Sequence, residues 1–158
     1  MLTIRIVCIG KLKESYLRDA QAEYAKRLGA FCKLEIVELS EYRLPDKPSE
    51  AQIQKGLTEE GMQILTKLSG VCVPLCIEGK TISSPALAEK IASFANCGES
   101  TITFVIGGSF GLSDEVKQRG AFKLSMSPMT FPHQLARIML LEQVYHAFQI
   151  QSGGKYHK

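Results

Sequence analysis

The chain has 158 residues, a formal net charge of +3, and apolar and charged shares of 45% and 22%. This length suits one ordinary domain with a proper core, and the composition is that of a soluble globular protein. No apolar run is long enough to span a bilayer, and the first residues lack the order of a signal peptide, so we expect a cytoplasmic protein with no membrane partner.

The cysteines and the charge exclude little about possible partners. Cys72 and Cys76 are the only close pair among the five cysteines, and their spacing on an expected strand does not match a zinc knuckle. We therefore expect reduced thiols that pack as small hydrophobic groups, and no metal site. The mildly basic charge permits an anionic partner such as RNA without requiring one.

The pattern of apolar residues predicts strands that alternate with helices. Short β-branched runs indicate strands, and stretches with apolar residues every three or four positions indicate helices. The expected elements are a strand at 2–9, a helix at 14–28, a strand at 34–39, a helix at 49–68, a strand at 71–77, a helix at 84–95 capped by Ser84, a strand at 101–106, a short helix after Ser113, a short strand at 122–126, and a long helix from 130 or 131 to 151. This alternation predicts a single α/β domain over 1–158, with a mostly parallel sheet and helices on both faces.

Ligands of such sheets bind outside the carboxyl ends of the strands, so three turns are candidates for a site. They are residues 78–80, the glycine-rich turn that starts at Gly107, and the segment 126–131. The backbone of the Gly107 turn could hold a phosphate, an adenine or a ribose, or it could be a tight strand-to-helix turn only. It matches neither the dinucleotide fingerprint nor a P-loop, which disfavours phosphate transfer.

The segment before the last helix mixes prolines with apolar residues. Apolar side chains in a loop suggest a wall for a flat, partly apolar ligand, although a loop tucked under the last helix is an equal alternative. His133 lies in the first turn of that helix, where the positive end of the helix dipole favours a neutral imidazole. We expect His133 to cap the helix or to position other groups.

The last helix and the tail carry two further signals. The apolar stripe of the helix is wide enough to suggest a second buried surface, such as a homodimer contact. The tail, 153–158, combines a tyrosine, a histidine and two lysines after a glycine pair. Such a composition suits stacking on a base and pairing with phosphates, while the alternative is an idle terminus.

Four segments together resemble a known family. They are residues 105–112, 129–134, 141–145 and 156–158, and the likeness extends over the whole chain, including 7–13 and 60–61. The sequence is similar to the large-subunit ribosomal RNA pseudouridine N3-methyltransferases, which belong to the SPOUT class. The resemblance implies an α/β fold with a C-terminal trefoil knot, which pattern reasoning alone would not propose.

The resemblance also implies a cofactor, a partner and a substrate. The cofactor is S-adenosylmethionine, and its expected contacts are Leu75, Gly107, Met126, Ser127, Pro128, Met129, Thr130 and Phe131. The enzyme is expected to act as a homodimer, with no DNA partner. Its substrate would be 23S ribosomal RNA within the large subunit or the assembled ribosome.

The implied reaction moves a methyl group to N3 of a pseudouridine, whose acidic N–H proton must be removed or its anion stabilised. His157 and Tyr156 are expected near the target base, and Lys158 and Arg137 on phosphate or developing charge. His133 would shape the pocket, and the tail of one chain could complete the pocket of the other. Three alternatives stay open: a SPOUT methyltransferase of transfer RNA, a non-catalytic module that binds RNA or the ribosome, and an ordinary nucleotide-binding domain.

Overall fold

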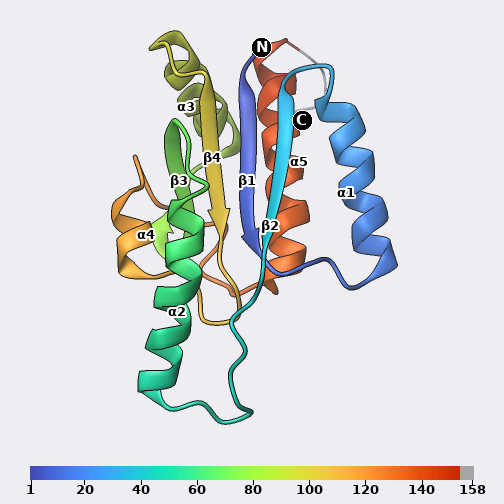
Figure 1. The fold of residues 1–158 in the computed structure, drawn as a ribbon. Coiled ribbons are helices and arrows are strands. Elements are labelled where there is room, and N and C mark those ends of the chain that lie inside the picture. Colours follow the sequence, from blue (N-terminus) through green and yellow to red (C-terminus); the bar gives the residue numbers. More distant parts are fainter. Residues whose placement is uncertain (154–158) are drawn as a thin grey trace.

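Four parallel strands form the centre of the protein (Figure 1). The structure is a computed structural model, and it describes residues 1–153. The strands are β1 (Thr3–Ile9), β2 (Lys33–Leu39), β3 (Val71–Lys80) and β4 (Thr101–Ile106). Their order across the sheet is β2-β1-β4-β3, and every neighbouring pair is parallel.

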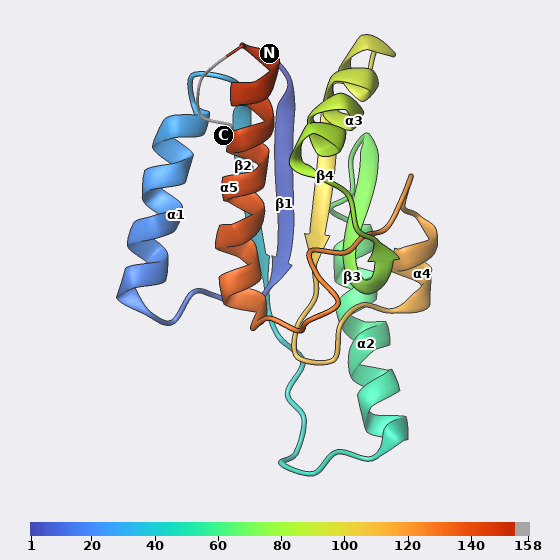
Figure 2. The ribbon, with the colours of Figure 1, turned by 180° about the vertical axis from the view of Figure 1, so that it is seen from behind.

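Helices cover both faces of the sheet. They are α1 (Ser15–Leu28), α2 (Glu50–Leu65), α3 (Ser84–Asn96), α4 (Asp114–Gln118) and α5 (His133–Gln151). Helix α5 packs against α1 and α3 on one face (Figure 2), while α2 and α4 pack together on the other. The expected layered α/β architecture is confirmed, and the trefoil knot stays a prediction.

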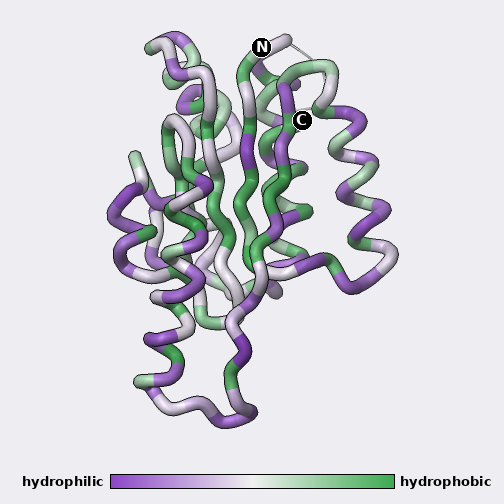
Figure 3. Tube along the Cα trace, viewed as in Figure 1, coloured by the Kyte–Doolittle hydropathy of each residue, from purple (hydrophilic) through white to green (hydrophobic). Residues whose placement is uncertain are grey.

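The side chains on the two faces of the central strands belong to two hydrophobic clusters. Ile4 and Ile6 of β1 pack with Leu141 and its neighbours on α5, whereas Val7 packs with Ile64 of α2 and Val116 of α4. This alternation follows from the two-residue period of a strand. Figure 3 shows the apolar residues along the central strands and more polar ones over the outer helices. Each fully buried aliphatic side chain contributes roughly 1.5–3 kcal/mol to folding.

The main error in the predicted elements concerns residues 122–126. Only Leu124 of that segment makes ladder contacts, as isolated bridges to β3. The Lys80 N–H donates to the Lys123 carbonyl oxygen at 2.9 Å, and the Ser125 N–H donates to the Lys80 carbonyl oxygen at 3.0 Å. The end of β3 therefore curls around Leu124, which pairs as a single bridging residue and not as part of a strand, and β3 extends beyond its predicted end at 77.

Helix starts explain two smaller corrections. Ser83, not Ser84, caps α3, since its Oγ accepts from the Ala86 N–H at 3.2 Å, and Ser84 lies inside the helix. The last helix begins only at His133, with Pro132 as its N-cap. No helix within residues 1–153 combines the length and the apolar character needed to cross a membrane.

We expect the five thiols to react with a disulfide reagent such as DTNB at very different rates. Burial raises the pKa of the Cys8, Cys32 and Cys72 thiols to about 11, so at pH 8 they are protonated as well as inaccessible. Cys97 is exposed and should react first, and the half-buried Cys76 more slowly. Stopped-flow absorbance of the native protein, with Cys97→Ser as control, measures this. A fast phase that persists in Cys97→Ser would contradict the assignment.

Candidate functional site

The three turns selected from the sequence meet around one cavity at the carboxyl ends of β3 and β4. Its volume is about 390 Å³, within the usual range of small-molecule sites. The predicted site residues that line it are Leu75, Gly107, Met126, Ser127, Met129, Thr130, Phe131 and His133. Pro128 is exposed and lies outside this lining.

The glycines that follow β4 shape their turn for different physical reasons. A Cβ on Gly107 would overlap the carbonyl group of Gly111, so no side chain fits there. Gly111 itself has a φ of 84°, a left-handed conformation that favours glycine. Its N–H donates to the Gly108 carbonyl oxygen at 3.1 Å. The turn therefore folds back on itself and presents its backbone to the cavity.

The curled end of β3 brings residues 78–80 and the loop 126–131 together beside the glycine-rich turn. Gly79 permits the close approach, because a Cβ there would lie 2.8 Å from the Lys123 carbonyl oxygen. Leu124 then bridges to Leu75, a cavity residue. The chain that leaves Leu124 runs directly into the loop 126–131, so the first and third turns are joined through main-chain contacts.

The loop 126–131 is held by its own hydrogen bonds. Ser127 Oγ accepts from the Met129 N–H at 3.0 Å, and the Ser127 carbonyl oxygen accepts from Ser125 Oγ at 3.1 Å. Met129 is 72% exposed, so its thioether is available to a ligand or a partner. Of the two interpretations of this loop, the structure supports a cavity wall, because its residues other than Pro128 line the cavity.

His133 enters the cavity from the start of α5. A Cβ on Gly10 would lie 4.0 Å from His133 Nε2, which places the imidazole over the end of β1. The neighbouring Gln134 accepts from the Lys13 N–H at 2.9 Å through Oε1. The start of α5 is thus tied to the loop after β1, and the imidazole lies in the cavity wall.

Arg137, one turn further along α5, does not occupy the position expected of a phosphate ligand. Its side chain is 1% exposed and pairs with Glu38 at 2.6 Å. The guanidinium also donates to Gln21 Oε1 and to the Gly10 carbonyl oxygen, both at 3.1 Å. Because these groups enclose it, Arg137 joins the ends of β1 and β2 to α1 and α5 and does not reach the surface where a phosphate would lie.

An ion pair at the cavity was missed by the sequence reasoning. Glu78 and Lys117 both line the cavity and form a salt bridge between the end of β3 and α4. The hydrogen bond from Lys117 lowers the pKa of Glu78, and the same contact raises the pKa of Lys117. Glu78 belongs to one of the three turns selected from the sequence, and the structure places it in β3, but nothing in the sequence indicated that Lys117 would lie beside it.

The tail residues Tyr156, His157 and Lys158 lie outside the residues that the structure describes, so their expected contacts with RNA stay predictions. Within residues 1–153, no group of three or more His, Cys, Asp or Glu side chains could hold a metal ion.

Comparison with known proteins settles the family. A family model described as a predicted SPOUT methyltransferase matches residues 2–157. The chain belongs to the SPOUT methyltransferase family. This SPOUT methyltransferase is also 47% identical, over 159 residues, to the ribosomal RNA large subunit methyltransferase H of Streptococcus pneumoniae (strain CGSP14). That alignment covers 99% of this chain and 100% of the pneumococcal protein, and the same figures hold for strain 70585.

Solved structures agree with this SPOUT methyltransferase in fold. A "probable methylase family protein" from Haemophilus influenzae Rd KW20 aligns with a TM-score of 0.59 at 17% identity, covering 98% of this chain and 70% of that one. A protein from Legionella pneumophila, described as a methyltransferase and solved with bound S-adenosylmethionine, aligns with a TM-score of 0.51 at 15% identity. The alignment covers 95% of this chain and 66% of that one.

Replacement of Arg137 by methionine tests its structural role. We expect this SPOUT methyltransferase to lose about 2–4 kcal/mol of unfolding free energy, because Glu38 and the Gly10 carbonyl group would lose a buried cationic partner. Urea denaturation at pH 7 measures the loss. Arg27→Met is the control, since Arg27 forms an exposed pair with Glu23 on one helix and should cost much less. Equal losses in the two variants would show that the Arg137 contacts are not structural.

Proposed function

We propose that the protein transfers a methyl group from S-adenosylmethionine to N3 of a pseudouridine in 23S ribosomal RNA of the large subunit. The observation that carries the proposal is the cavity at the ends of β3 and β4. All of the residues expected to bind the cofactor line it except Pro128. The whole-length identity of 47% to a large-subunit ribosomal RNA methyltransferase supports the substrate class.

The lining of the cavity suits S-adenosylmethionine, which has a flat adenine, a ribose diol and a charged amino-acid end. Leu75, Met126 and Phe131 provide apolar surface for the adenine, and the turn at Gly107 provides backbone groups. Glu78 and Lys117 offer a carboxylate and an ammonium group to the polar parts. When bound, this cofactor supplies a methyl group on a positively charged sulfur, already activated for transfer.

The chain's own residues would then orient the reactants. Gly107 and the loop 126–131 hold the cofactor, and His133 closes the wall beside them. Tyr156 and His157 meet the target base, with Lys158 on phosphate, and a base near N3 removes its proton. Alignment at near-attack distance is the main contribution of such an enzyme. Arg137 acts as a positioning residue, because it holds the start of α5 in place.

We propose that the working form is a homodimer acting on ribosomes in the cytoplasm. Two exposed apolar side chains lie on the loop and helix that border the site, Met129 at 72% and Leu135, on α5, at 38% exposure. A second copy packed on this side would bury them and could bring its tail to the cavity. The substrate of this dimer would be the assembled large subunit.

Replacement of Gly107 by alanine is expected to weaken S-adenosylmethionine binding at least tenfold. The added Cβ would overlap Gly111, so the turn would have to open and its backbone would leave the cavity wall. Isothermal calorimetry measures the affinity. Gly29→Ala is the control, since a Cβ there meets its nearest atom at an ordinary 3.4 Å. Unchanged affinity in Gly107→Ala would place the cofactor elsewhere.

Deletion of residues 155–158 tests the tail. We expect methylation of ribosomal RNA to fall below detection while S-adenosylmethionine affinity changes less than about threefold, because the deletion leaves the cavity intact. Tritiated methyl transfer to ribosomes, stripped ribosomal RNA and transfer RNA, measured in parallel, reads out activity and separates the transfer-RNA alternative. Retained activity on ribosomes would overturn the assignment of the tail.

Mixed dimers of the deletion variant and Gly107→Ala show which chain uses the tail. One protomer then carries an intact cavity and the other an intact tail. Restored activity on mixing means that the tail serves the partner's cavity, and no restoration means that each chain uses its own tail. Calorimetric titration with ATP tests the nucleotide-binding alternative. Heat of binding on titration with S-adenosylmethionine excludes a module that binds RNA only.

A further inference from the structure

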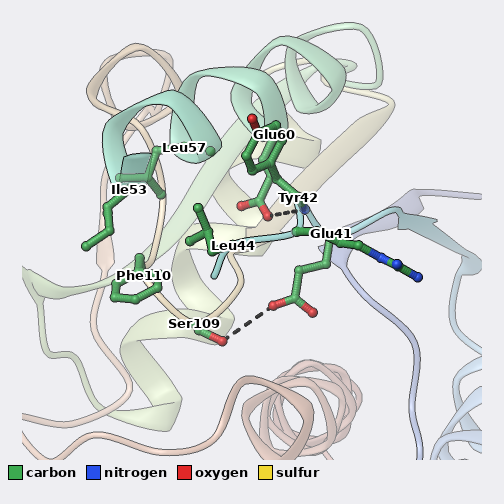
Figure 4. A pocket seen from close by; sticks show the side chains of 10 residues that line it. Glu41, Tyr42, Leu44, Ile53, Leu57, Glu60, Ser109 and Phe110 are labelled. Carbon is green, nitrogen blue, oxygen red and sulfur yellow. Dashed lines mark hydrogen bonds between the residues drawn. The ribbon is translucent and has the colours of Figure 1, made fainter. Parts of the chain in front are cut away.

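A second cavity lies behind the glycine-rich turn of the cofactor site. Its volume is about 440 Å³, and it is formed by the loop after β2, by α2 and by two residues of the turn after β4 (Figure 4). Ser109 and Phe110 line both this cavity and the cofactor cavity. The two spaces are therefore neighbours that share a wall of two residues.

One side of the second cavity is apolar. Leu44, Ile53, Leu57 and Phe110 line it together (Figure 4). The Phe110 ring is 49% exposed, so its surface is open to a ligand. An exposed aromatic ring beside aliphatic side chains can hold a flat, partly apolar group.

The other side carries acceptor groups. Glu41 lies at the mouth and accepts a long hydrogen bond of 3.5 Å from Ser109 Oγ. Glu60 lies deeper, at 8% exposure, and its Oε2 accepts from the Tyr42 N–H at 2.9 Å. None of the residues in 1–153 donates a hydrogen bond to the other oxygen, Oε1. A ligand with N–H groups would find unused acceptor capacity there.

Burial of the Glu60 carboxylate does not stabilise the fold. Burial is the main cause that raises the pKa of Glu60, the charge of Glu41 adds to it, and the Tyr42 N–H opposes it. A carboxylate that is buried with one neutral donor is destabilised in its charged form. A buried polar group that does not stabilise the fold is expected at a functional position.

The loop that carries Tyr42 packs against α2. A Cβ on Gly56 would lie 3.1 Å from the Tyr42 ring, which shows that the ring packs on the bare backbone of α2. Glu60 Oε1 lies 3.7 Å from the position of a Cβ on Gly108. The acceptor therefore faces the back of the turn whose front lines the cofactor cavity.

We propose that this second cavity binds an unpaired nucleobase of the RNA substrate, with its flat face on Phe110 and an N–H edge directed at Glu60. Single-stranded bases are read by aromatic stacking and by hydrogen bonds to their edges, and carboxylates accept from the N–H groups of guanine or cytosine. The base is not the one that is methylated, because that base must enter the cofactor cavity on the far side of the shared wall. It is a neighbour in the same strand.

This inference rests on the proposed function for the nature of the substrate. The carboxylates Glu41 and Glu60 make the cavity unsuitable for phosphate, so the strand's backbone has to stay outside. Arg43 is the cation in the lining and could meet a phosphate at the mouth.

Two substitutions test the proposal by different routes. Glu60→Gln keeps the shape and an acceptor for Tyr42 but removes the charge, and Leu57→Trp fills the cavity. Both are expected to lower kcat/KM for ribosomal RNA at least tenfold while S-adenosylmethionine affinity stays within twofold. Glu59→Gln, on the exposed side of the same helix, is the matched control and should behave as the unmodified protein.

Thermal unfolding separates a binding role from a structural one. Glu60→Gln removes a buried charge, so its Tm at pH 7 should equal or exceed that of the unmodified protein even though its activity is lower. If Glu60→Gln and Leu57→Trp methylate with unchanged kcat/KM, the proposal is wrong. It is also wrong if the lost activity of Glu60→Gln comes with a lower Tm and weaker cofactor binding, since Glu60 would then only support the turn after β4.

A binding assay distinguishes failure of this inference from failure of the proposed function. Fluorescence anisotropy with a labelled, guanine-containing single-stranded RNA needs no methyl transfer. Tenfold weaker binding by Glu60→Gln than by Glu59→Gln supports the base site even if no ribosomal RNA is methylated. Equal binding by the two variants, or no binding by the unmodified protein, overturns it.

Discussion

The main-chain contact between Lys123 and the end of β3 is the constraint on which the cofactor cavity depends. It exists because Gly79 has no side chain, as a Cβ there would lie 2.8 Å from the Lys123 carbonyl oxygen. The hydrogen bonds of Lys80 with Lys123 and Ser125 then bring the segment after Leu124 beside β3 and direct it into the loop 126–131. Without this contact the third wall of the cavity would have no fixed position.

Arg137 holds the fourth side of the site in a different way. Its buried guanidinium reaches Glu38, Gln21 and the Gly10 carbonyl oxygen, so one side chain connects two strand ends and two helices. A guanidinium suits this task because its planar set of N–H donors can serve several acceptors at once. The start of α5, with His133, is thereby fixed next to the turn at Gly107.

The turn after β4 separates two cavities of different character. The front cavity has apolar walls, backbone groups and the Glu78–Lys117 pair, which suit a small cofactor with both charges. The cavity behind it has an aromatic ring, the exposed carboxylate of Glu41 and the buried carboxylate of Glu60, which suit a base with N–H donors. A substrate strand that bends around Ser109 and Phe110 could place one base in each, so the wall would set the register of the RNA relative to the methyl group.

Local patterns in the sequence determined the layered α/β fold and most element boundaries, because strand and helix periods depend on neighbouring residues. The resemblance of four segments to known methyltransferases indicated the SPOUT family. The local patterns also selected the three turns of the cofactor cavity, through the rule that ligands bind at the carboxyl ends of parallel strands. They failed at 122–126, where pairing with the curled end of β3 replaces a strand, and they gave no sign of the partners of Arg137, which are distant in the chain. The Glu78–Lys117 pair and the acceptor at Glu60 were equally invisible, since both arise from elements that meet only in the folded protein. Tertiary structure alone decided them, because charge pairing and burial depend on distance in space and not on spacing along the chain.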